Sequence, residues 1–150
     1  MLKNLNPLLT PELLYVLAAM GHGDDLVLCD ANFPAESVAR TTVYGRPVRV
    51  AGADAPSVAR AILSVLPLDE LVNVPASRME VSDDPQVVPA VQQEVQAAVD
   101  EVMGRSLAMQ PIERFAFYAA SRQAYAVVAT SERRFWGCFL FKKGVVPPAA

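Results

Sequence analysis

The feature that most constrains this chain is the short apolar run Leu26–Cys29, which has no polar interruption and ends at Asp30. A continuous run of this length is typical of a strand that is covered on both faces, as in a parallel sheet. The segment before it, residues 10–20, has a capping hydroxyl, a proline in its first turn and leucines at helical spacing. This order predicts a helix, a turn at Gly21-His22-Gly23 and then a buried strand.

Helical and strand-like patterns alternate along the rest of the chain. Helices are predicted at residues 55–65, 83–103 and 113–123, and strands at 48–50, within 71–81, at 124–129 and at 139–141. The last two strands flank the polar turn 131–134, and we expect them to form an antiparallel pair. The pattern predicts one domain over residues 1–150 with three α/β/α layers, a mostly parallel sheet and one antiparallel strand near the C-terminus.

Composition limits the partners of this chain. Hydrophobic residues make up 53% of the 150 residues and charged residues 19%, which favours a compact protein with buried or interfacial surface and is consistent with a homo-oligomer. The net charge is -3 and the basic residues are scattered, so we expect no nucleic-acid partner. No stretch approaches the roughly 18 apolar residues of a membrane span, and residues 1–7 lack the apolar core of a signal peptide. We therefore expect a cytoplasmic protein with no membrane partner.

Metal ligands of the usual kinds are few. The chain has two cysteines, Cys29 and Cys138, and one histidine, His22. Without an export signal the cysteines are predicted to be free thiols. Two thiols and one imidazole make a poor zinc site, so no metal is expected.

His22 and Asp30 flank the predicted strand and are the first candidates for chemistry. A histidine side chain titrates near neutrality and can act as a base in one step and as an acid in the next, although a surface histidine in a turn is the simpler interpretation. Its glycine neighbours allow a sharp turn and leave space for a ligand. Asp30 lies where ligands bind in open α/β sheets, and it either contacts a ligand, orients an imidazole or caps the following turn.

The other candidates lie in the last third of the chain. Arg114 can fork onto vicinal hydroxyls or a carboxylate, although a pair with Glu113 on a helix surface or a solvated charge is commoner. Trp136 offers a flat wall for a sugar ring, or it packs against a turn. Cys138 is expected to be a buried, inert thiol, and Tyr118 and Tyr125 are interpreted as core or interface residues.

Several of these stretches occur together in one known family. The segments "MLKNLNPLLTPELLYVLAAMGHGDDLVLCDANFP", "ERFAFYAASRQAYAVVATSE" and "FKKGVV" cover most of the chain. Together they resemble the family of sugar mutarotases that contains L-fucose mutarotase and D-ribose pyranase. The Arg-Phe-x-Phe-Tyr stretch is more similar to the fucose branch.

The resemblance implies a site and an assembly. By position, His22 corresponds to the catalytic histidine of the family, and Asp30 and Arg114 correspond to its sugar-binding residues. Trp136-Gly137-Cys138 stands where the family usually has Tyr-Gly-Asn, so an indole and a thiol replace a phenol and an amide. Members of the family are described as cofactor-free proteins that assemble into rings, with sites completed by a neighbouring subunit. The resemblance therefore implies a homo-oligomer with shared sites, and the size of the ring, a decamer being one alternative, stays open.

These expectations combine into a functional hypothesis with two rivals. We expect a cofactor-free mutarotase that interconverts the anomers of L-fucose or a related aldose, with His22 reaching a sugar held near Asp30. The altered Trp136-Gly137-Cys138 stretch leaves open a monosaccharide-binding or regulatory protein without turnover. A ring protein with a purely structural role is the third alternative.

Overall fold

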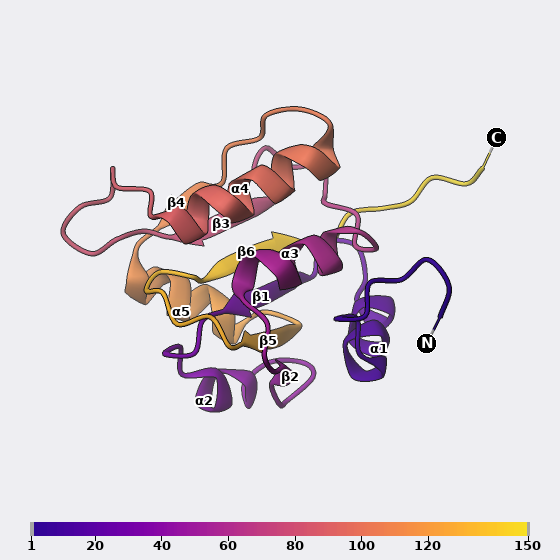
Figure 1. The fold of residues 1–150 in the computed structure, drawn as a ribbon, viewed down its shortest axis with the longest axis horizontal. Coiled ribbons are helices and arrows are strands. Elements are labelled where there is room, and N and C mark those ends of the chain that lie inside the picture. The colour runs from indigo at the N-terminus through magenta and orange to yellow at the C-terminus, as the bar shows by residue number, and fades with distance from the viewer. Residues whose placement is uncertain (1, 150) are drawn as a thin grey trace.

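The computed structural model describes residues 2–149 and contains a single six-stranded sheet flanked by helices. The helices are α1 (Pro11–Ala19), α2 (Ala35–Ala39), α3 (Ala55–Leu63), α4 (Ala90–Met103) and α5 (Arg114–Arg122). The strands are β1 (Asp25–Cys29), β2 (Val48–Val50), β3 (Ala76–Met79), β4 (Gln110–Ile112), β5 (Ala126–Thr130) and β6 (Phe139–Lys142). Their order across the sheet is β2-β5-β1-β6-β3-β4 (Figure 1).

Strand β6 runs against its neighbours. The pairs β1–β5, β2–β5 and β3–β4 are parallel, whereas β6 is antiparallel to both β1 and β3. A mostly parallel sheet with an antiparallel strand near the C-terminus is therefore confirmed. The predicted pairing of β5 with β6 is wrong, because β1 lies between them. The segment that connects β5 to β6 consequently crosses the carboxyl end of β1, beside Asp30.

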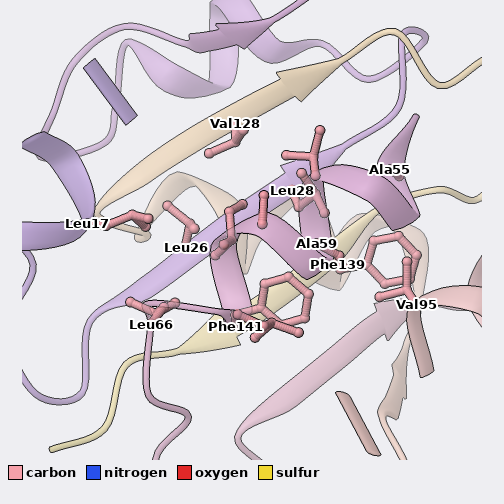
Figure 2. Packing of buried hydrophobic residues seen from close by; sticks show 14 of the residues in the cluster. Leu17, Leu26, Leu28, Ala55, Ala59, Leu66, Val95, Val128, Phe139 and Phe141 are labelled. Atoms are coloured by element: carbon pink, nitrogen blue, oxygen red, sulfur yellow. The ribbon is translucent and has the colours of Figure 1, made fainter. Parts of the chain in front are cut away.

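The three-layer arrangement follows from the side chains of the central strand. Leu26 and Leu28 point into a core that α1, α3 and α4 cover, and Figure 2 shows them beside Phe139 and Phe141. Val27 and Cys29 point to the opposite face, into a core that α2 and α5 cover. A strand with one face in water alternates polar and apolar residues, but both faces of β1 are buried, so its residues can all be apolar. This explains the continuous apolar run in the sequence.

Capping side chains and prolines set the helix boundaries. Helix α1 begins where the Thr10 hydroxyl accepts a hydrogen bond from the Leu13 N–H at 3.2 Å, as predicted. The helix predicted at 83–103 begins only at Ala90, because Pro85 and Pro89 disfavour helical conformation in the residues before them. Helix α2 and strand β4 were not predicted, since segments of five and three residues are too short to show a period.

Three further expectations can be compared with the described part of the chain. Cys29 and Cys138 are both buried and free, which confirms the prediction of free thiols. Residues 2–149 contain no helix that is long and apolar enough to cross a membrane. Within the same range, no group of three or more His, Cys, Asp or Glu side chains is arranged to hold a metal ion.

Candidate active site

A pocket of about 230 Å³ opens at the carboxyl end of β1. It brings together four of the residues that the sequence singled out, Asp30, Arg114, Trp136 and Cys138, and Gly137 lies directly behind them. The remaining lining residues are Asn32, Phe33, Met79, Tyr118 and Phe135. The pocket therefore combines a few polar groups with aromatic and apolar walls, which is the usual make-up of a small-molecule site.

The buried carboxylate of Asp30 organises this pocket. Its Oδ1 accepts hydrogen bonds from the N–H groups of Asn32 and Phe33 at 3.0 and 3.1 Å. Its Oδ2 accepts from the Gly137 N–H at 3.1 Å and from the Cys138 thiol at 3.5 Å. The capping role is thus confirmed, and the same side chain also fixes the segment that follows β5. Contact between Asp30 and a ligand stays a prediction.

The Trp136-Gly137 backbone is forced close to Asp30. A Cβ atom at Gly137 would lie 3.1 Å from Cγ of Glu132 and 3.3 Å from Cβ of Asp30, so only glycine fits without displacement. Trp136 has φ of 68°, a left-handed conformation that is uncommon for a bulky residue. Its carbonyl accepts a hydrogen bond from Nε2 of the fully buried Gln92 at 2.9 Å. These contacts hold the indole at the pocket wall.

Cys138 is the buried thiol that the sequence predicted, but it is also part of the pocket wall. Burial raises the pKa of the Cys138 thiol well above its ordinary value, and the negative charge of Asp30 raises it further. The thiol therefore stays protonated and acts as a weak donor to Asp30, not as a nucleophile.

Arg114 presents a donor that has no partner in the described part of the chain. It is the first residue of α5, where the Glu113 carboxylate caps the helix by accepting from the Phe115 and Ala116 N–H groups at 2.9 and 3.0 Å. The Arg114 guanidinium lies over the Phe115 ring, 4.6 Å from its centroid. Its Nε is buried and has no hydrogen-bond partner among residues 2–149. A buried N–H without a partner is rare, and in a pocket it indicates a place for a ligand oxygen.

Glu132 fixes the segment that carries Trp136 and Cys138, although the sequence alone indicated only that Glu132 belongs to a turn. Its buried carboxylate accepts from Nε and Nη2 of Arg134 at 3.0 and 2.9 Å and from the Ala55 N–H at the start of α3 at 3.3 Å. Arg134 also pairs with Glu94 of α4 at 2.8 Å. The segment 131–138 is thereby tied to α3 and α4.

This network predicts a loss of stability in acid. Hydrogen bonds from Arg134 lower the pKa of Glu132 from 4.5 to about 2. Because the folded state lowers this pKa, the stabilisation is complete above pH 4.5 and is lost as the pH falls towards about 2. We expect Glu132→Gln to reduce the free energy of unfolding by about 2 kcal/mol near neutral pH, after allowance for the partial exposure of Arg134.

Denaturant unfolding between pH 7 and pH 3 measures this effect. The stability of Glu132→Gln should depend less on pH than that of the wild type. Glu36→Gln is the matched control, because Glu36 pairs with Arg49 on the surface and should contribute less than about 1 kcal/mol. Equal losses in the two variants would contradict the role given to Glu132.

His22 lies at the other end of β1 from the pocket. The turn Gly21–Gly23 precedes this five-residue strand and Asp30 follows it, and such a strand spans about 13 Å. Within one chain, His22 therefore does not line the pocket that holds Asp30, and the expectation that it reaches a sugar there stays a prediction. Gly23 has φ of 85°, so the glycine after the histidine is needed for the turn itself.

Asp69 is the residue that sequence reasoning missed. Nε2 of the half-exposed His22 lies 3.1 Å from Oδ2 of Asp69, whose side chain is only 3% exposed. The alternative that Asp30 orients the imidazole is thereby excluded within one chain. Asp69 lies in a loop between α3 and β3 and follows no recognisable motif, so only the fold could bring it to His22.

The fold and the pocket define a class: an α/β protein with a small polar and aromatic site at the carboxyl end of its central strand. The chain belongs to the RbsD / FucU transport protein family, whose pattern it matches over residues 3–146. It is 39% identical to an L-fucose mutarotase of Actinobacillus pleuropneumoniae over 147 residues, which cover 98% of this chain and 99% of that protein. This agrees with the resemblance noted in the sequence.

Solved structures support the same assignment. A crystal structure of a fucose mutarotase from Streptococcus pneumoniae in complex with L-fucose superposes with a TM-score of 0.87 at 32% identity, covering 97% of this chain and all of that one. A second crystal structure, named only for sugar binding, has a TM-score of 0.95 at 50% identity and covers 98% of this chain and 97% of that one.

Proposed function

We propose that this protein is a cofactor-free sugar mutarotase that interconverts the anomers of L-fucose or a related aldose in the cytoplasm. The observation that carries the proposal is the pocket in which Arg114 keeps an unpaired Nε beside Asp30 and Trp136. A guanidinium donor and an aromatic wall suit the hydroxyl edge and the C–H face of a pyranose. The Streptococcus pneumoniae relative that binds L-fucose supports a monosaccharide as the ligand.

A second copy of the chain completes this site in the proposal. His22 and the pocket lie at opposite ends of β1, so the imidazole that serves one pocket must come from a neighbouring protomer. Contact between two different surfaces of identical chains is heterologous, and such contacts close into rings when the rotation allows. A ring with shared sites, including the decamer that the family resemblance implies, meets this requirement.

Exposed apolar side chains accompany both halves of the divided site. Phe135 at the pocket is 71% exposed, and Phe115 beside Arg114 is also exposed. At the His22 end, Leu71 is 76% exposed, and Val145 and Val146 are exposed as well. Burial of these two patches against each other would bring His22 to the pocket and would remove apolar surface from water.

The chemistry requires only proton transfers. His22 removes the proton from the anomeric hydroxyl while the ring oxygen accepts a proton, the bond between C1 and the ring oxygen breaks, and an open-chain aldehyde forms. Rotation about the C1–C2 bond and the reverse transfers close the ring on the other face. Arg114 and Asp30 hold hydroxyls during this cycle. Tyr118, whose phenol lines the pocket, or a water molecule carries the second proton.

One-dimensional NMR saturation transfer between the two anomers tests this function across several aldoses. Exchange that depends on the protein supports the mutarotase. Line broadening of a sugar without exchange would instead indicate the binding or regulatory protein. If the protein causes neither exchange nor broadening, the structural ring protein is favoured.

The Trp136-Gly137-Cys138 stretch makes the choice of sugar testable. The substitutions Trp136→Tyr and Cys138→Asn restore the residues usual in the family and add a phenol and an amide that can form hydrogen bonds with sugar hydroxyls. Each such hydrogen bond contributes about 1 kcal/mol to binding. We expect the double variant to shift its preference towards L-fucose by about tenfold relative to D-ribose and D-galactose. Exchange rates for the three sugars under one condition measure the ranking, and an identical ranking in both proteins would show that this stretch does not select the sugar.

A further inference from the structure

We propose that Asp69 is a positioning residue that keeps the proton of neutral His22 on Nε2, so that Nδ1 is the atom that exchanges protons with the sugar. This inference rests on the proposed function of His22 and specifies how that residue works. Nε2 lies 3.1 Å from Oδ2 of Asp69, within hydrogen-bond distance. A carboxylate can only accept, so the nitrogen that faces it must carry the hydrogen.

The position of Asp69 is fixed by its own backbone and by its neighbours. Its Oδ1 accepts from the Leu71 N–H at 3.0 Å, and its N–H donates to the Lys142 carbonyl at 3.0 Å. The loop is also pressed against Gly144, where a Cβ atom would lie 2.8 Å from Cα of Asp69 and 2.4 Å from the Leu68 carbonyl oxygen. One carboxylate oxygen is therefore anchored and the other is presented to the imidazole.

The other charged groups around the turn are directed elsewhere. Asp24 accepts from the Gly21 N–H at 2.7 Å. The Lys142 ammonium pairs with Asp25 at 2.8 Å, and the Lys143 ammonium donates to the Leu17 carbonyl at 2.7 Å. Glu70 is exposed. Asp69 is thus the carboxylate that contacts His22 among residues 2–149.

Asp69 remains charged through the neutral range. The hydrogen bond from the Leu71 N–H, followed by the interaction with His22, lowers the pKa of Asp69 below its ordinary value. With the hydrogen on Nε2, the lone pair of Nδ1 is left to accept a proton. When Nδ1 takes the proton of the anomeric hydroxyl, the resulting imidazolium lies against the Asp69 carboxylate, and the same nitrogen then returns the proton.

Because His22 is the only histidine in the chain, ¹⁵N-labelled histidine gives the signals of one imidazole. In the assembled wild-type protein, we expect the neutral form of the His22 imidazole to carry its proton on Nε2 and none on Nδ1. In Asp69→Asn the amide oxygen should remain on the Leu71 N–H, so the amide NH₂ faces the ring and donates to Nε2. The proton should then move to Nδ1, which blocks the base.

The kinetic consequence is a fall in kcat with little change in KM. We expect Asp69→Asn to lower kcat for anomer exchange by about 10²- to 10⁴-fold, because Asp69 lies outside the pocket that binds the sugar. Glu70→Gln is the control: it removes the same charge one residue away, and it should change neither the tautomer nor kcat.

The wild-type tautomer decides the proposal even if Asp69→Asn does not fold. A wild-type imidazole with the proton on Nδ1 would overturn it, as would a folded Asp69→Asn protein with an unchanged tautomer and kcat. Failure of the proposed function is a different result, namely the Nε2–H tautomer in a wild-type protein that exchanges no anomers.

Discussion

His22→Ala should lower the rate of anomer exchange by about 10²- to 10⁴-fold, because it removes the group that transfers the proton. The fold should persist, since His22 is half-exposed in a turn and lies outside both hydrophobic cores. Saturation transfer measures the exchange, and thermal unfolding and light scattering verify that fold and assembly are unchanged. Near-normal exchange in a folded, assembled variant would remove His22 from the mechanism.

Mixing two inactive variants should restore activity if each site is shared. His22→Ala destroys the imidazole of one protomer, and Arg114→Ala destroys the pocket of the other, so each pure variant contains only damaged sites. In randomly mixed assemblies, about a quarter of the sites combine an intact His22 with an intact Arg114. We therefore expect co-expressed, differently tagged variants to recover about a quarter of the wild-type rate.

A matched pair of variants controls this experiment. His22→Ala and Asp69→Asn damage the same half of the site, so their mixture contains no site with both residues intact and should recover no more than the residual activity of Asp69→Asn. Mixed assemblies of His22→Ala with Arg114→Ala that show no recovery would contradict a site shared between protomers.

The sequence predicted the centre of the fold better than its edges. The uninterrupted run Leu26–Cys29 identified a strand buried on both faces, and alternating helices and strands indicated the three layers. The partner of β6 could not be predicted, because the polar turn before it is as consistent with a hairpin as with a crossing over β1. Similarly, the valines of residues 83–103 predicted a helix over the whole segment, but two prolines near its beginning place the start of α4 at Ala90.

The candidate site was predicted in pieces whose arrangement only the structure supplied. The carboxyl end of β1, the start of α5 and the segment before β6 lie together at one end of the central strands, and this brings together Asp30, Arg114, Trp136 and Cys138. The distance from His22 to this pocket depends on the length of β1, which a resemblance between sequences does not convey. Asp69 had no sequence signal, since a single aspartate in a loop is common.

Equilibration of a freshly dissolved single anomer of L-fucose tests the central claim most directly. With protein far below the sugar concentration, the relaxation rate followed by polarimetry should rise in proportion to the wild-type concentration, and the same concentrations of His22→Ala should raise it about 10²- to 10⁴-fold less. A rate that is independent of wild-type concentration, in a protein shown to bind the sugar, would contradict turnover and would leave a monosaccharide-binding protein.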